Sequence, residues 1–87
     1  MLNQLSPQDR IEATRLIQEA CNQLGVPAQR GRQVLYWNAH INGEPIANLA
    51  ILKSKLTRLD ELITDFNREI ALQQLRRQRP VEQEELT

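Results

Sequence analysis

Residues 56–70 read LTRLDELITDFNREI, and their spacing predicts a helix that packs lengthwise against another helix. A heptad repeat that starts at Leu49 has apolar residues at seven of its eight core positions, which are Leu49, Leu52, Leu56, Leu59, Ile63, Phe66 and Ile70. An exposed Leu or Ile forgoes about 1.5 to 3 kcal/mol of burial free energy. These seven residues, which form an apolar seam, must therefore be buried against another helix.

No Gly and no further Pro interrupts the chain between Pro45 and Arg77, which predicts a third helix over 45–77. The first helix is about half as long and would leave part of the seam exposed. We therefore predict that a second copy covers it, so that the seven seam residues form a homodimer interface. In a parallel dimer Lys55 would face Asp60 of the second copy, but the orientation stays open. The alternative is an antiparallel bundle within one chain.

The composition is typical of helices rather than of sandwiches or barrels, because aromatic residues are scarce and good helix formers are abundant. We predict an all-α fold. The chain is expected to be a small three-helix protein with one domain over 1–79. Its long C-terminal helix would form a coiled-coil-like dimer or bundle. A core in a chain of 87 residues is marginal on its own, which also favours association.

Capping residues predict the first helix and the start of the second. Ser6 and Pro7 suit a helix start, and Gly25 suits a left-handed helix end, which gives a helix over 7–24. The next helix is expected over 28–41, beginning just after Pro27.

Two segments later in the chain are harder to interpret. Residues 33–43 have strand-forming side chains and end in a turn dipeptide, but Pro45 cannot donate a ladder hydrogen bond, so we prefer helix, break, helix over a hairpin. The acidic residues 80–87 are expected to form a mobile tail. The basic run at 76–79 would then stabilise the negative end of the third helix.

Residues that carry chemistry are few. Cys21 lies on the apolar face of the first helix and is predicted to be core, while His40 lies near a helix end and is expected to cap it or face solvent. One Cys and one His cannot supply a four-ligand zinc site, and the three glycines are too widely spaced for a phosphate-binding loop. We predict no catalytic activity, no metal and no cofactor. The acidic residues Asp60, Glu61 and Asp65 are expected to be a solvated helix face.

The chain is expected to be a cytoplasmic protein. A single cysteine suits a reducing compartment, and no segment has the roughly 18 apolar residues of a membrane span or the pattern of a signal peptide. The formal net charge is zero, so no overall field attracts nucleic acid or an anionic membrane.

A DNA-binding alternative rests on residues 17–39. A helix that ends at Gly25, a short break, and a second helix with Arg30, Arg32 and Gln33 have the outline of a helix-turn-helix. Against it, Gly31 weakens the second helix, and residues 1–43 hold four Arg against three acidic residues, which is nearly neutral.

The preferred function is protein interaction. Trp37 is expected to fill the space between helices, and Tyr36 points to another face, so the pair is a candidate anchor for a partner protein. We therefore expect a homodimeric adaptor, regulator or assembly factor, with a small dimeric DNA-binding regulator as the alternative.

Overall fold

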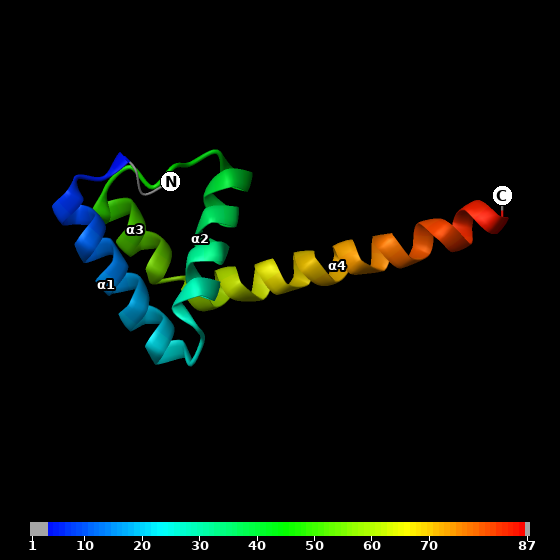
Figure 1. The fold of residues 1–87 in the computed structure, drawn as a ribbon, viewed down its shortest axis with the longest axis horizontal. Helices are drawn as coiled ribbons and strands as arrows, with labels where there is room; N and C mark the ends of the chain where they lie inside the picture. Colours follow the sequence, from blue (N-terminus) through cyan, green and yellow to red (C-terminus); the bar gives the residue numbers. More distant parts are fainter. Residues whose placement is uncertain (1–3, 87) are drawn as a thin grey trace.

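The computed structural model describes the backbone of residues 4–86 and the side chains of residues 4–77. Its elements are α1 (Pro7–Leu24), α2 (Ala28–Asn42), α3 (Leu49–Leu56) and α4 (Leu59–Leu86) (Figure 1). The described chain holds helices and no strand, which confirms the all-α prediction. It has four helices in place of the three that were expected.

The first two helices begin and end within one residue of the predicted ranges. The backbone N–H of Asp9 donates to Ser6 Oγ at 3.1 Å, and Gly25 ends α1 with a φ of 70°. α2 follows directly after Pro27 and ends at Gly43, whose φ is 62°. Residues 33–42 are thus helical, and the hairpin alternative is wrong.

The predicted third helix is divided in two. α3 begins at Leu49 rather than near Pro45 because the Asn48 side chain caps it, with the Ile51 N–H donating to Asn48 Oδ1 at 2.9 Å. It ends at Leu56, and a turn at residues 57–58 leads into α4. Neither Gly nor Pro marks this turn. Tertiary packing explains it, because α3 packs on α1 whereas α4 packs on α2, and one straight helix does not serve both neighbours.

The C-terminal end also differs from the expectation. α4 continues through Pro80 to Leu86, so the backbone of 80–86 is helical, and Thr87 lies outside the described residues. The basic run at 76–79 therefore lies inside α4 and not at its end. The last turn of α4 has no basic residue at all. The expected mobility of residues 80–87 stays a prediction.

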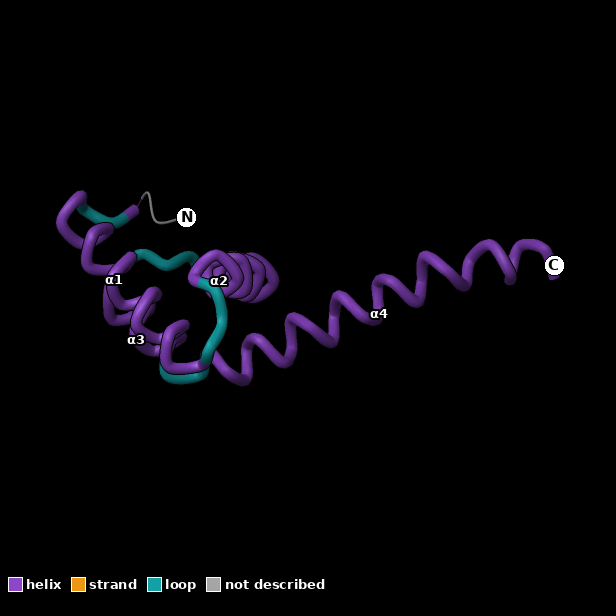
Figure 2. Tube along the Cα trace, turned by 60° about the horizontal axis from the view of Figure 1, so that its bottom comes forward, coloured by secondary structure: helices purple, strands orange, loops and turns teal. Residues whose placement is uncertain are grey.

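The core lies among α1, α2, α3 and the first turns of α4. Its fully buried larger side chains are Ile17, Cys21, Val34, Leu35, Ile46, Leu52 and Leu59. The remainder of α4 projects away from this helical cluster (Figure 2). The molecule is consequently elongated, with principal extents of 56 × 26 × 17 Å.

Candidate functional site

The seven seam residues lie on two helices, and much of the seam is covered by its own chain. Leu52, Leu59 and Phe66 are buried in the core, at 0%, 1% and 6% exposure. The other four, which are Leu49, Leu56, Ile63 and Ile70, are half-buried against it. A second copy is therefore not needed to shelter the first three. The homodimer interface predicted for these residues stays a prediction that a single chain does not test.

Phe66 joins α4 to α2 through two contacts on its ring. The Trp37 ring meets it edge to face, with centroids 5.4 Å apart and an interplanar angle of 65°. The Arg30 guanidinium carbon lies 5.8 Å from the Phe66 ring centroid, within cation–π range. Trp37 thus packs against the core, as expected of a residue that fills space between helices, while Tyr36 is 38% exposed.

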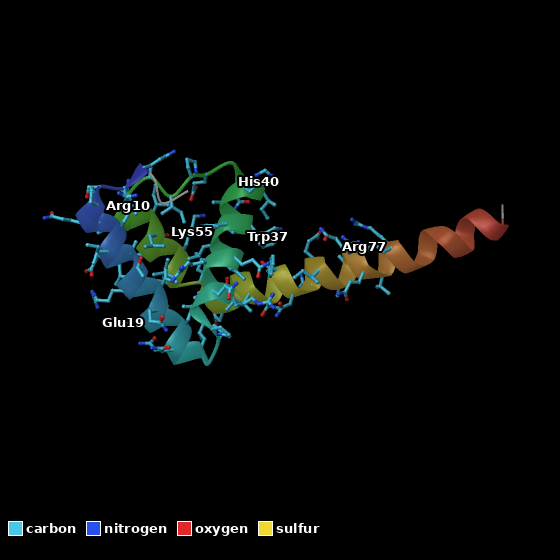
Figure 3. The ribbon with its side chains drawn as sticks, viewed as in Figure 1. Arg10, Glu19, Trp37, His40, Lys55 and Arg77 are labelled. Atoms are coloured by element: carbon cyan, nitrogen blue, oxygen red, sulfur yellow. The ribbon has the colours of Figure 1, made fainter. Side chains whose placement is uncertain are left out.

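Lys55 has a contact that sequence analysis did not predict. It is buried, at 8% exposure, and its Nζ donates to Asn38 Oδ1 of α2 at 2.8 Å. The same Nζ lies 3.3 Å from Glu44 Oε1 in the segment between α2 and α3. Lys55 therefore ties α3 to α2 within one chain; Figure 3 shows its position on α3. A pairing with Asp60 of a second copy would need Lys55 at the surface, whereas its side chain is buried. The only sequence signal was Lys55 three residues after Leu52 on the buried side of α3.

A pocket of about 440 Å³ lies beside this contact, between α2, α3 and the start of α4. Trp37 and Ile41 supply apolar lining, and Glu44, Lys55, Arg58 and Asp65 supply charged lining. Two acidic and two basic side chains leave the pocket without a dominant charge. The Lys55 ammonium is already engaged by two oxygen atoms, so the arrangement suits a structural tie better than a reacting group.

The DNA-binding candidates are all exposed on α2 and line two neighbouring depressions. Arg32 and Gln33 are exposed and, with Gln29 and Tyr36, line a shallow depression on the outer face of the helix. Arg30 is also exposed; it lies over the Phe66 ring of α4 and lines the second depression with Pro27, Gln29 and Gln33. The sequence of α2 contains no Asp or Glu. The exposed side of α2 is thus polar and weakly basic, and Gln29 and Gln33 are shared by the depression beside Arg30 and the one beside Arg32.

Gly31 of α2 has a structural role where α2 packs against α1. It is buried against Cys21, and an added Cβ would overlap the Cys21 Sγ. Gly31 is therefore explained by the close approach of α1 and α2 rather than by contact with a ligand. Cys21 is fully buried, which confirms it as core, and burial raises the pKa of its thiol.

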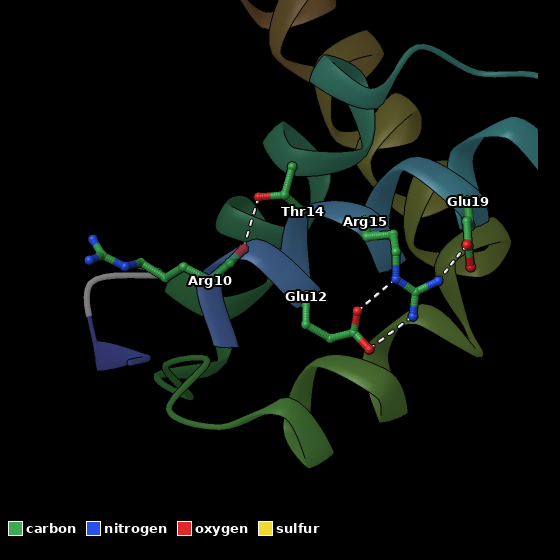
Figure 4. Close-up of polar contacts among 5 residues, drawn as sticks. All are labelled: Arg10, Glu12, Thr14, Arg15 and Glu19. Carbon is green, nitrogen blue, oxygen red and sulfur yellow. Dashed lines mark hydrogen bonds and ion pairs between the residues drawn. The ribbon is translucent and has the colours of Figure 1, made fainter. Parts of the chain in front are cut away.

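Arg15 forms two ion pairs on the surface of α1 (Figure 4). Arg15 Nε lies 2.6 Å from Glu12 Oε1, and Arg15 Nη1 lies 2.5 Å from Glu19 Oε1. The hydrogen bond from Arg15 lowers the pKa of Glu12. The side chains of Glu12, Arg15 and Glu19 are all exposed, so they belong to a solvated face of α1. Asp60, Glu61 and Asp65 are likewise exposed, and so is His40.

The part of α4 beyond Ile70, residues 71–86, is here called the distal segment. All side chains from Ala71 to Arg77 are exposed, including Leu72 at 41% and Leu75 at 48%. Arg77 lies far from the helical cluster in Figure 3. An isolated helix of this length is marginal in water, and an internal proline costs about 3 kcal/mol. The described side chains of the distal segment, residues 71–77, therefore give this helix little stabilisation from packing.

Two further properties hold for the part of the chain that the structure describes. No group of three or more His, Cys, Asp or Glu side chains lies in an arrangement that would hold a metal ion. Among the same residues, no helix combines the length and the apolar character needed to cross a membrane.

Comparison with known proteins gives no relative. The chain matches no protein-family model, no curated protein and no solved structure.

Proposed function

We propose that this chain is a non-enzymatic protein-interaction module that acts as a homodimer, and that the distal segment of α4 is the part that associates. One observation carries the proposal: a continuous helix leaves the helical cluster, and its side chains described beyond Ile70, Leu72 and Leu75 among them, are exposed. Contacts with a second copy would supply the stabilisation that this helix lacks.

The interface proposed here lies further along the chain than the seam at residues 49–70. Three residues of that seam, Leu52, Leu59 and Phe66, are buried in the core, whereas Leu72 and Leu75 are exposed. They are three residues apart on α4, so they lie on the same side of the helix. Association through this side would leave the helical cluster, including Tyr36 on α2, free to contact a further protein.

The first test is the molar mass in solution as a function of concentration, measured by light scattering after size exclusion. The wild type should approach the mass of a dimer as concentration rises. A Leu72→Lys, Leu75→Lys variant should remain monomeric with unchanged helicity, because both side chains are exposed and removing them leaves no cavity. A Gln73→Lys, Gln74→Lys variant is the matched control, since it adds the same charge to other sides of α4.

Wild-type protein that stays monomeric up to millimolar concentration contradicts the proposal. So does a Leu72→Lys, Leu75→Lys variant that dimerises as well as the control does.

DNA binding is the second candidate, and the exposed side of α2 favours it. Arg32, Gln33 and Tyr36 face outward from the second helix of a pair joined by a three-residue connection, Gly25 to Pro27. Fluorescence anisotropy with mixed-sequence duplex at low and moderate salt tests it. Salt-sensitive binding that is lost in Arg32→Ala supports a DNA contact, and no binding at low salt removes this candidate. Arg10→Ala on α1 is the matched control.

A further inference from the structure

The distal segment has a charge pattern that is complementary to itself when its direction is reversed. Between Leu75 and Leu86 the sequence reads LRRQRPVEQEEL, with three Arg in the first half and three Glu in the second half. If two copies lie antiparallel with positions 80 and 81 at the centre, position 75 lies opposite 86, 76 opposite 85, 77 opposite 84 and 79 opposite 82. Every arginine of one copy then lies at the same height along the helix axis as a glutamate of the other copy. Position 75 of each copy, a leucine, lies at the height of position 86 of the other, also a leucine.

The helical register places part of this pattern on one side of α4. Positions 75, 79, 82 and 86 are spaced 4, 3 and 4 residues apart, which is the spacing of one continuous face of a helix. This spacing is the same when read from either end. In an antiparallel pair, the four positions of this face in one copy therefore lie opposite the same four positions of the other copy. Leu72 lies one further step toward the helical cluster on the same face, outside the paired positions 75–86, and its side chain is exposed.

The electrostatics of a single copy also favour a partner at this position. Glu84 and Glu85 lie in the last turn of α4, where the negative end of the helix dipole disfavours acidic residues, and no basic residue is present there. In the antiparallel arrangement positions 76 and 77 of the second copy reach the same level along the axis, while the pair at 79 and 82 lies on the shared face. A parallel arrangement in register would instead place arginine opposite arginine and glutamate opposite glutamate.

We propose that two copies of this chain associate through antiparallel contact between their distal segments, with the two-fold axis passing near Pro80 and Val81. This inference rests on the proposed homodimer and specifies its surface, register and direction. An isologous contact of this kind closes after two copies, so it forms dimers and not filaments. The two helical clusters then lie at opposite ends of the assembly.

Charge exchange at positions 79 and 82 tests the pairing, with sedimentation equilibrium at low salt as the measurement. Arg79→Glu places glutamate opposite glutamate twice per dimer, and Glu82→Arg places arginine opposite arginine twice. Each single variant should weaken association by roughly tenfold or more. The double variant Arg79→Glu, Glu82→Arg restores opposite charges and should associate like the wild type, as should an equimolar mixture of the two single variants. Arg68→Glu is the matched control, because position 68 lies outside the overlap.

Salt and direction provide two further measurements. Raising the ionic strength from low to about 0.5 M should weaken the wild-type dimer, because exposed ion pairs are screened.

Nitroxide labels on single cysteines in a Cys21→Ala background report the relative direction of the two helices. At a rise of 1.5 Å per residue, antiparallel contact separates paired labels along the axis by about 22 Å at position 73 and about 8 Å at position 83. A parallel dimer gives equal separations at both positions.

The outcomes separate this inference from the proposed function. A monomeric wild type refutes both. A dimer that is unaffected by Arg79→Glu and Glu82→Arg, or one with equal label separations, refutes the antiparallel pairing and leaves the homodimer standing. Loss of association in the single variants, recovery in the double variant and unequal separations support the pairing.

Discussion

Gly31 of α2 lies so close to Cys21 of α1 that a Cβ atom at position 31 would overlap the Cys21 Sγ atom. Both residues are buried, and the contact lies where the two helices approach each other. A glycine inside a helix costs about 1 kcal/mol relative to alanine. The closer packing that Gly31 allows is what offsets this cost.

Gly31→Ala should therefore destabilise the protein, although it improves helix propensity. Fitting a methyl group into a filled core typically costs about 1 to 3 kcal/mol, which exceeds the propensity gain. Urea unfolding followed by circular dichroism measures the change. Cys21→Ala removes the sulfur that the new methyl group meets, so the double variant should be more stable than the sum of the single effects predicts. Additive effects, or a more stable Gly31→Ala protein, would show that the helices have room to separate.

Lys55 should contribute to stability through its contact with Asn38. Lys55→Met keeps most of the aliphatic stem but leaves the buried Asn38 Oδ1 without its donor, which should cost about 1 to 3 kcal/mol in thermal or urea unfolding. Lys53→Met is the control, because Lys53 is exposed on the same helix and should change stability by less than about 0.5 kcal/mol.

A rescue variant separates the hydrogen bond from general packing. Replacing both partners, as Lys55→Met with Asn38→Leu, removes the unsatisfied oxygen and should recover part of the loss. Equal stability losses for Lys53→Met and Lys55→Met would mean that the Asn38 contact contributes nothing.

The sequence was sufficient for the local features of the fold. Ser6 and Gly25 act at the two ends of α1 through a side chain and a positive φ, so α1 was predictable from short stretches. Gly43 ends α2 through a positive φ, although Asn42-Gly43 is also a hairpin-turn signal. The all-α class followed from composition in the same way.

The division of the C-terminal helix was not predictable from those local signals. Thr57 and Arg58 are ordinary helix residues, and the turn there depends on α3 and α4 packing against different neighbours. Asn48 was a usable capping signal that was missed, because Pro45 offered a competing helix start. The predicted third helix ends at Arg77, before Pro80, yet α4 passes through Pro80 to Leu86. The candidate site was not fully predictable for the same reason. A heptad pattern identifies apolar residues that need burial, but it does not specify which helix buries them.

Glu12 should titrate below the ordinary range of a glutamate because Arg15 donates hydrogen bonds to its carboxylate. Its folded-state pKa is lowered, so the stabilisation is complete above the unfolded pKa of about 4.3 and is lost as pH falls through the folded pKa. An NMR titration of the Glu12 carboxyl carbon measures this. In Arg15→Met the pKa should return toward its ordinary value, whereas Arg10→Met should leave it lowered. An identical Glu12 pKa in the wild type and in Arg15→Met would rule out the pairing in solution.

Arg30 should stabilise the α2–α4 contact through the ring of Phe66, which lies 5.8 Å from its guanidinium carbon. A double-mutant cycle of Arg30→Met and Phe66→Leu should give a coupling free energy of about 0.5 to 1 kcal/mol, the range for a cation–π contact at an exposed site. Arg32→Met in the same cycle is the control, because Arg32 lies on the outer face of α2 and should be additive with Phe66→Leu. Trp37 is the only tryptophan and packs on the same ring, so its fluorescence follows unfolding at the contact itself. A coupling for Arg32 as large as that for Arg30 would mean that general charge, and not the stacked geometry, links α2 to α4.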